Sequence, residues 1–560
     1  MPHKSLYPPV SIPETDIFSF LFARSSKPFA DTKEIFTDGE QPSRSYTYAQ
    51  LRTAACDFGR GLKTHWHWQR GDVLAFYTPN DIDTPAVTCG VLWAGGIASP
   101  VNPLYTVDEL TFQLTNAGAK ALATHIDFLP KAREAAAKAG IPQERIILVG
   151  EQGDAQNRVK HWTAIRSSSM AVASTNDAIH QQTNVHPKTD LAFLVYSSGT
   201  TGLPKGVRLS HYNVVANLLQ NDQMDGAHLK SFGGPGNSGD RMLGTLPFFH
   251  IYGLVNCVFM SIYAGWHLFV MARFDLEKAC QIIQANKVTF AYVPPPIVLA
   301  FGKDPIVDQY DLSSLKMMHS GAAPLTNELL ELFWNRLKLP VKQGYGLSET
   351  SPVTHVQMPD EWAKFMGSVG KLAPNMEAQI VDLEGNEVPL GEEGELWLKG
   401  PNVFGGYFNH PDKTKDAFSK DGWFKTGDIF KIDKYGNYYC VDRLKELIKY
   451  KGFQVPPAEL EGLLLGHEDV ADVCVIGVYD NSQATEIPRA YITLKKGVPE
   501  SDAKALEIVD WMAGKVAPHK RLRGGVHFTD VVPKSPSGKI LRRVMRDRVK
   551  QAERKAGPKL

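Results

Sequence analysis

Apolar and polar positions in the first third of the chain alternate between a helical and a strand period. Tyr48–Leu62 and Val107–Ala117 carry apolar residues at helical spacing, and Gly118 follows the second segment as a helix C-cap. Val73–Tyr77 and Ala121–Thr124 are short apolar runs typical of buried strands. Alternating helices and strands of this kind predict an α/β fold in which helices cover parallel sheets.

The pattern changes after Asp442. Val470–Val478 and Ala490–Leu494 are predicted as strands and Asp502–Val516 as a helix, which indicates a small α+β domain of about 115 residues. We therefore expect a domain boundary after residue 442.

Composition narrows the class of protein. Among 560 residues, Lys and Arg number 61 and Asp and Glu 60, so the basic surplus that a general nucleic-acid binder needs is missing. The six cysteines lack metal-ligand spacing, which argues against a zinc site or a disulfide framework. The polar, proline-rich start is unlike a secretory signal, and the polar Ser167–Pro187 is predicted as a surface connection.

One apolar stretch is long enough to be tested as a membrane span. Gly253–Ala272 contains no Asp, Glu, Lys or Arg. Asn256, His267 and two glycines interrupt it, so we predict a buried core segment and no membrane span.

The strongest chemical signal is Tyr196–Val207, YSSGTTGLPKGV, which follows an apolar strand at Leu191–Val195 and precedes a helical stretch from His211. Glycines let the backbone N–H groups approach a phosphate, while hydroxyls and the Lys205 ammonium add donors. The spacing differs from GxxxxGK[ST], so this is not the P-loop of kinases.

This segment resembles the signature of the acyl-adenylate-forming superfamily, and further motifs follow in family order at 246–253, 320–325, 343–350, 421–428, 442–454 and 532–543. The resemblance spans nearly the whole chain. It implies a large N-terminal domain over 1–442, made of helix-covered parallel sheets with a distorted β-barrel subdomain. A hinge at 443–445 and a small mobile α+β domain over 446–560 would follow. ATP phosphates would be bound by Ser197, Ser198, Gly199, Thr200, Thr201 and Lys205.

The resemblance also assigns the nucleoside side. The Ala322 loop would lie against the adenine, Tyr345 would stack on it, and Asp428 would bind the ribose hydroxyls. The remaining contacts implied are Gln343 and Gly344 beside the adenine, Ser348 on a phosphate oxygen, Arg443 on the ribose, and Glu349 holding Mg²⁺.

For the acid and coenzyme A, the implied roles fall on two groups. His250 would lie against the acyl group in a pocket lined by Tyr252, Asn256 and Val356, and Lys539 is the catalytic lysine. For thioester formation, Lys445 would be the hinge, with Lys449 and Gln454 entering the site and Lys451, Gly452 and Arg273 contacting coenzyme A.

The hinge segment, DRLKELIKYKGFQ, looks most like 4-coumarate-CoA ligases and fungal aryl-CoA ligases. The function implied is ligation of an aryl or medium-chain acid to coenzyme A through an acyl-adenylate, with release of pyrophosphate. A luciferase-like adenylating oxygenase and a catalytically silent nucleotide-binding homologue are the alternatives. Pro558-Lys559-Leu560 resembles the Ser-Lys-Leu address read by the peroxisomal import receptor, so we expect a peroxisomal location, with the cytoplasm as alternative.

Overall fold

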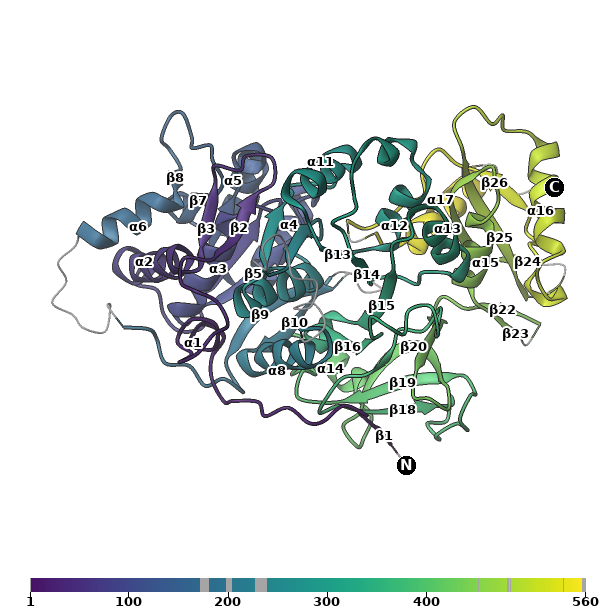
Figure 1. Ribbon diagram of the computed structural model, residues 1–560, viewed down its shortest axis with the longest axis horizontal. Coiled ribbons are helices and arrows are strands. Elements are labelled where there is room, and N and C mark those ends of the chain that lie inside the picture. The colour runs from purple at the N-terminus through teal and green to yellow at the C-terminus, as the bar shows by residue number, and fades with distance from the viewer. Residues whose placement is uncertain are drawn as a thin grey trace.

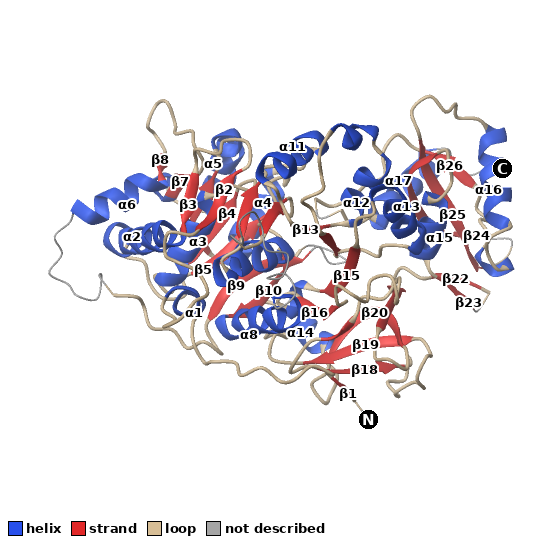
Figure 2. Ribbon diagram, in the orientation of Figure 1, coloured by secondary structure: helices blue, strands red, loops and turns tan. Residues whose placement is uncertain are grey.

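The computed structural model describes residues 2–171, 181–197, 204–226, 239–451, 453–480, 483, 485–536 and 538–555, with backbone alone at 167–171, 550 and 552–555. Figure 1 shows a large N-terminal part, coloured purple to green, and a smaller C-terminal part in yellow beside α12 and α13. Figure 2 shows helices packed on both faces of the sheets in the large part.

The first sheet has seven strands in the order β10-β9-β5-β4-β6-β7-β8, parallel except for the β9–β10 pair. Along β4, Leu74 and Phe76 pack under α2 and α3, whereas Ala75 and Tyr77 pack under α4 and α5. Helices therefore cover both faces. The strands are β4 (Val73–Tyr77), β5 (Ile97–Val101), β6 (Ala119–Thr124), β7 (Ile146–Leu148), β8 (Lys160–His161), β9 (Leu191–Ser197) and β10 (Lys205–Ser210); the helices are α2 (Tyr48–Trp66), α3 (Asp83–Trp93), α4 (Val107–Ala117), α5 (Leu129–Lys138) and α6 (Trp162–Ala171).

The second sheet has nine strands in the order β17-β16-β15-β14-β13-β11-β12-β2-β3, with a parallel centre from β15 to β2. One face packs on α11, α12 and α13, and the other shares a core with the first sheet. The strands are β2 (Glu34–Asp38), β3 (Ser45–Thr47), β11 (Arg241–Gly244), β12 (His267–Val270), β13 (Phe290–Val293), β14 (Met317–Ser320), β15 (Val341–Gly346), β16 (Val353–Val356) and β17 (Lys371–Leu372); the helices are α1 (Ile17–Phe22), α8 (His211–Asn221), α10 (Met260–Ala264), α11 (Leu276–Asn286), α12 (Pro295–Lys303) and α13 (Asn327–Leu337).

The third sheet of the N-terminal part is an antiparallel half-barrel in the order β1-β18-β19-β20-β21. Its apolar side packs on β16 and β17. Its strands are β1 (His3–Lys4), β18 (Glu377–Val381), β19 (Gly394–Lys399), β20 (Phe424–Ile432) and β21 (Tyr438–Arg443), and α14 (Pro411–Ala417) leads into β20.

The C-terminal part has its own core. A long antiparallel pair, β24 (Val470–Asp480) and β25 (Thr485–Leu494), is extended by β26 (Val526–Phe528), which runs parallel to β25. Three helices, α15 (Pro457–Leu465), α16 (Asp502–Ala513) and α17 (Arg542–Lys555), accompany this sheet, and β22 (Ile448–Tyr450) with β23 (Phe453–Val455) forms a separate hairpin.

The predicted fold class is confirmed, including the half-barrel and the small α+β unit. Gly118 caps α4 with φ 64°, as the sequence indicated. Gly253–Ala272 is buried core made of a π-helix (Gly253–Phe259), α10 and β12. Among the described residues, we find no helix with the length and apolarity to cross a bilayer.

Two sequence predictions need correction. A strand, β10, lies between the predicted phosphate loop and α8. Residues Lys205–Ser210 form this strand because they pair with β9 at the edge of the first sheet. Residues 167–171 continue α6 instead of starting a surface connection, because Trp162 and Ile165 anchor that helix in the core. Residues 172–180 of that prediction lie outside the described residues.

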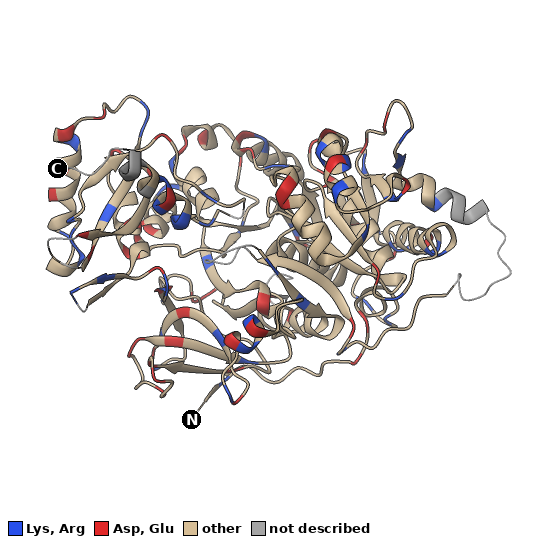
Figure 3. Cartoon of the chain, turned by 180° about the vertical axis from the view of Figure 1, so that it is seen from behind, with Lys and Arg blue, Asp and Glu red and all other residues tan. Residues whose placement is uncertain are grey.

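Charges of both signs are interspersed over the two parts in Figure 3, in line with the near-zero net charge. Lys342 and Asp225 form a fully buried ion pair, in which the Lys342 ammonium on β15 contacts the carboxylate of Asp225. That carboxylate also accepts a hydrogen bond from the Tyr292 hydroxyl (3.2 Å) and lies 3.4 Å from Nδ1 of His319. Burial alone would raise the pKa of Asp225, but Lys342 and His319 hold it below its ordinary value.

Loss of one partner of this pair should be costly. We expect Lys342→Met to lower the free energy of unfolding by about 3–5 kcal/mol, since Asp225 would remain buried without its cation. The double variant Lys342→Met/Asp225→Asn should recover most of that loss. Urea unfolding followed by tryptophan fluorescence measures both, and equal midpoints for the single and double variants would contradict the assignment.

Candidate active site

The phosphate side is built where β9 and β10 diverge. Ser197 and Lys205 are directly paired across these strands, so the ends of the loop between them are fixed. The loop positions Ser198, Gly199, Thr200 and Thr201 lie outside the described residues. The Ser197 hydroxyl donates to the buried carboxylate of Glu349 at 3.4 Å. Burial lowers the pKa of Lys205, and the charge of Glu349 opposes that shift.

Tyr407 was not predicted from the sequence, yet it contacts both Glu349 and Lys205. Its hydroxyl donates to Glu349 at 2.9 Å, and the Lys205 ammonium lies 4.8 Å from the centre of its ring. Tyr407 reaches this position because its segment pairs with β10, where Phe408 N–H donates to the Gly206 carbonyl at 2.8 Å. Its sequence signal was an aromatic residue after two glycines, which carries no chemical signature by itself.

The nucleoside side is formed by β15 and the half-barrel. The Tyr345 hydroxyl donates to the Asp428 carboxylate at 2.6 Å, and Nε of Arg443 lies 3.4 Å from the other carboxylate oxygen. Asp428 and Arg443 are directly opposite on β20 and β21, which explains why residues fifteen positions apart meet. Nearby, Gln343 and Gly344 lie on β15, Ala322 holds a left-handed φ of 72° after β14, and Ser348 begins the turn that carries Glu349.

Lys539 comes from the C-terminal part and reaches this group of residues. Burial and the neighbouring Arg443 guanidinium lower its pKa to about 8, partly opposed by Glu446 and Asp428. Its loop is closed by two hydrogen bonds to Ser535, of 2.8 and 3.1 Å. Gly538 (φ 81°) packs so tightly on Pro294 and Pro296 that an added Cβ would lie 3.0 Å from a proline ring carbon.

The predicted acid-binding residues start beside Lys539. Burial, together with the Lys539 charge, lowers the pKa of His250 to about 4, so this imidazole is neutral at pH 7. Tyr252 donates to the His319 carbonyl at 3.2 Å and packs on the Tyr292 ring, with centroids 5.7 Å apart. The Tyr252 ring also lies against Gly321, where a Cβ would approach it to 3.1 Å.

Two further pocket residues are buried in different surroundings. Asn256 is fully buried on the π-helix one turn beyond Tyr252. Val356 packs at the end of β16 in the hydrophobic cluster of the half-barrel, which also includes Tyr345. Val356 therefore packs in the same hydrophobic cluster as Tyr345, whereas Tyr252 packs in the cluster between the two large sheets.

The residues predicted for thioester formation lie apart from this group. Lys449 and Gln454 face each other across the β22–β23 hairpin, and both are exposed. Lys451 precedes Gly452, which lies outside the described residues. Arg273 is exposed over the Phe128 ring at 6.0 Å. Lys445 is exposed, and its charge contributes to the lowered pKa of Lys205.

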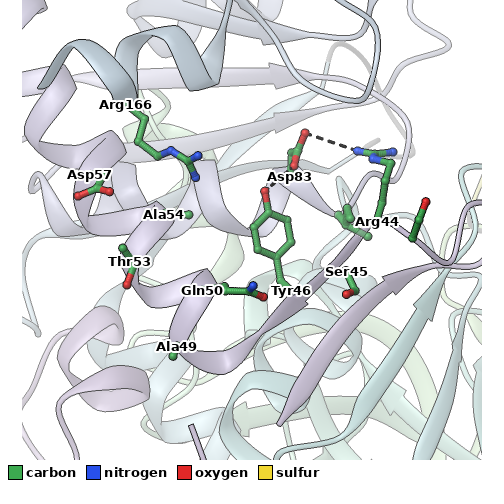
Figure 4. A pocket seen from close by; sticks show the side chains of 12 residues that line it. Arg44, Ser45, Tyr46, Ala49, Gln50, Thr53, Ala54, Asp57, Asp83 and Arg166 are labelled. Atoms are coloured by element: carbon green, nitrogen blue, oxygen red, sulfur yellow. Dashed lines mark hydrogen bonds and ion pairs between the residues drawn. The ribbon is translucent and has the colours of Figure 1, made fainter. Parts of the chain in front are cut away.

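A separate cavity of about 640 Å³ opens between β3, α2 and α6 (Figure 4). Its most prominent cation, Arg44, is engaged by Asp38 (2.8 Å), Asp81 (3.2 Å) and Asp83 (3.5 Å). The Tyr46 hydroxyl donates to Asp83 at 2.8 Å. None of its twelve lining residues belongs to the predicted site, and Arg44 is already neutralised, so we do not place the reaction here.

Two protein-family models match the chain. The profile described as "AMP-binding enzyme" matches residues 22–408, and "AMP-binding enzyme C-terminal domain" matches residues 459–539. The chain is 38% identical to probable 4-coumarate–CoA ligase 1 of Dictyostelium discoideum, covering 97% of both chains. It is 34% identical to a phenylacetyl-CoA ligase of Aspergillus niger, covering 96% of this chain and 98% of that one.

A solved structure shows the same architecture. An anthranilate CoA ligase in complex with anthranoyl-AMP superposes with a TM-score of 0.84 at 25% identity, covering 96% of this chain and 98% of that one. The two matched profiles, the full-length relatives and this shared fold lead to one assignment. The chain belongs to the AMP-binding enzyme family, in its branch of AMP-forming acyl- and aryl-CoA ligases.

Proposed function

We propose that this ligase activates an aryl or medium-chain carboxylic acid and that Lys539 is the lysine that promotes adenylation. The observation that carries the proposal is the position of Lys539. It projects from the C-terminal part to a place where its charge lowers the pKa of His250, in the predicted acid pocket. Its own pKa is lowered by Arg443 and raised by Asp428, both on the predicted ribose side.

Charge explains why a lysine is needed there. A carboxylate attacking the α-phosphorus of ATP is an anion approaching a polyanion, so the reaction requires neutralisation and alignment. A new bond forms from the carboxylate oxygen to the α-phosphorus, and the bond from that phosphorus to its bridging oxygen breaks. Lys539 can stabilise charge at the reacting phosphoryl group, while Lys205 and Ser197 lie where pyrophosphate would leave.

We also propose that Glu349 holds Mg²⁺ together with ATP phosphates. Its carboxylate is buried and positioned by Ser197 and Tyr407, which fits an ion bound through one protein carboxylate and several phosphate oxygens. Among the described residues, we find no cluster of three His, Cys, Asp or Glu side chains suited to a metal, so phosphate would supply most ligands. The ion would withdraw charge from the departing pyrophosphate.

We expect the predicted acid pocket to favour a carboxylic acid with an apolar body. Tyr252 and Tyr292 supply aromatic surface, and His250 presents a neutral ring because burial lowers its pKa. Relatives named for 4-coumarate and phenylacetate support an aryl acid as the first choice.

For the second half-reaction we propose a rotation about Lys445. The coenzyme A thiol must reach the acyl carbonyl, and in this proposal Lys539 would occupy the space that the thiol needs. The exposed Lys449 and Gln454, together with Lys451 and Arg273, would then face coenzyme A. Acyl transfer forms the thioester bond and releases AMP.

We further propose that Pro558-Lys559-Leu560, which lies outside the described residues, directs the chain to peroxisomes through the import receptor. Its support is the position of the tripeptide at the end of a basic segment.

The substrate proposal is tested by measuring acyl-CoA formation with ATP and Mg²⁺ across aryl acids and fatty acids of graded length. We expect the highest kcat/KM among aryl or medium-chain acids. Higher values with short polar acids or with very long chains would overturn the substrate class, and absence of pyrophosphate release with every acid would overturn the adenylation mechanism.

Lys539→Ala should reduce adenylate formation, measured as pyrophosphate exchange, by at least about 100-fold, because it removes a charge aimed at the transition state. Thioester formation from supplied acyl-adenylate should change little. Lys534→Ala is the matched control, since Lys534 lies in the same segment but pairs with Asp472 at 2.7 Å. Equal loss of both half-reactions in Lys539→Ala would contradict the proposed role.

The pH dependence of kcat/KM for pyrophosphate exchange should report the Lys539 ammonium in the free enzyme. Because its pKa is lowered to about 8, the charged form is complete at lower pH and is lost as pH rises through about 8. Exchange should therefore decline on the alkaline side, and Lys539→Arg, even if slower, should lack that decline. An unchanged alkaline limb in the arginine variant would assign it to another group.

A further inference from the structure

Helix α15 is the first helix of the C-terminal part, and it packs on α13 of the N-terminal part (Figure 1). It starts at Pro457 after Pro456, and proline has no side-chain acceptor for the free N–H groups of a first helical turn. The missing cap comes from across the interface. The Asp442 carboxylate on β21 accepts a hydrogen bond from Ala458 N–H at 2.9 Å.

The opposite end of α15 is held by a cation. Lys303, the last residue of α12, donates from its ammonium to the Leu465 carbonyl at 3.1 Å and to the Val470 carbonyl at 3.2 Å. A carboxylate at the N-terminus and an ammonium at the C-terminus are the signs that a helix dipole favours. Both side chains belong to the N-terminal part, while the helix belongs to the C-terminal part.

The middle of the helix fits the same surface closely. A Cβ added to Gly462 would lie 2.0 Å from Cγ2 of Thr326, the residue that caps α13. Helix α12 contacts the C-terminal part at both of its ends: Lys303 holds α15, and Pro294 and Pro296 pack against Gly538. Helix α12 and the residue before it therefore contact both α15 and the loop that carries Lys539.

From this arrangement we propose that Asp442 and Lys303 act as positioning residues that latch the C-terminal part in its adenylating orientation. The inference rests on the proposed rotation about Lys445. Asp442 and Lys303 precede that residue and α15 follows it, so their hydrogen bonds to α15 are broken when the parts turn. The stability of these contacts then sets the fraction of enzyme in the adenylating orientation, and with it the ratio of the rates of the two half-reactions.

The test compares the half-reactions separately in Lys303→Met, which keeps the side-chain length and removes the charge. Pyrophosphate exchange should fall about five- to tenfold, since the variant loses two charge-assisted hydrogen bonds to the carbonyls of Leu465 and Val470. Thioester formation from supplied acyl-adenylate should be unchanged or faster, and KM for ATP should stay the same. Lys303→Arg, which keeps charge and donors, should restore the wild-type ratio.

Lys278→Met is the matched control, because Lys278 pairs with Glu40 on the surface of the N-terminal part. Gly462→Ala gives an independent test: it pushes α15 away from Thr326 without changing any charge, and it should shift the ratio in the same direction. An unaltered ratio in Lys303→Met, or an equal loss of both half-reactions, would overturn the latch. A wild-type protein that forms neither pyrophosphate nor thioester would instead overturn the proposed function.

Discussion

The structure depends on holding one ammonium, that of Lys539, in a largely enclosed position at the junction of two parts of the chain. Such a position is unfavourable for a cation, and the lowered pKa of Lys539 expresses that cost. Nearby Arg443 adds to it, while Glu446 and Asp428 compensate in part. The charge is therefore present but weakly stabilised until an anionic substrate arrives, which suits a group that must neutralise charge as it develops.

The surrounding side chains are arranged to keep that charge balance. Glu446 is itself paired with Arg542, which also donates to Glu461 at 2.9 Å, so carboxylates near the lysine are shared with a second, structural cation. On the far side of the site, Glu349 plays the corresponding part for Lys205. Each of the two proposed catalytic cations, Lys539 and Lys205, thus has an acidic neighbour that also interacts with other donors.

Much of this could be predicted from sequence because the relevant signals are local. The alternation of helices and strands predicted the sheets, and contiguous motifs singled out Ser197, Glu349, Asp428 and Lys539 as candidate site residues, whose roles stay predictions. Interactions between distant segments could not be predicted. Tyr407 joins the site through strand pairing with β10, and Lys342 meets Asp225 across 117 positions in the core. Strand β10 itself was missed because the glycine-rich motif overlaps its start. The role of Lys303 depends on where α15 docks, which no pattern around it records.

Register on the half-barrel has a consequence for motion. Arg443 is the last residue of β21 and is paired directly with Asp428, so the sheet anchors the backbone up to the first residue of the predicted hinge, 443–445. The proposed pivot, Lys445, therefore lies two positions beyond Arg443, the strand partner of Asp428. A turn about such a point moves distant groups through long arcs and near ones through short arcs. In the proposed reaction, the acyl-adenylate would stay in place near this pivot while the side chains around it are exchanged.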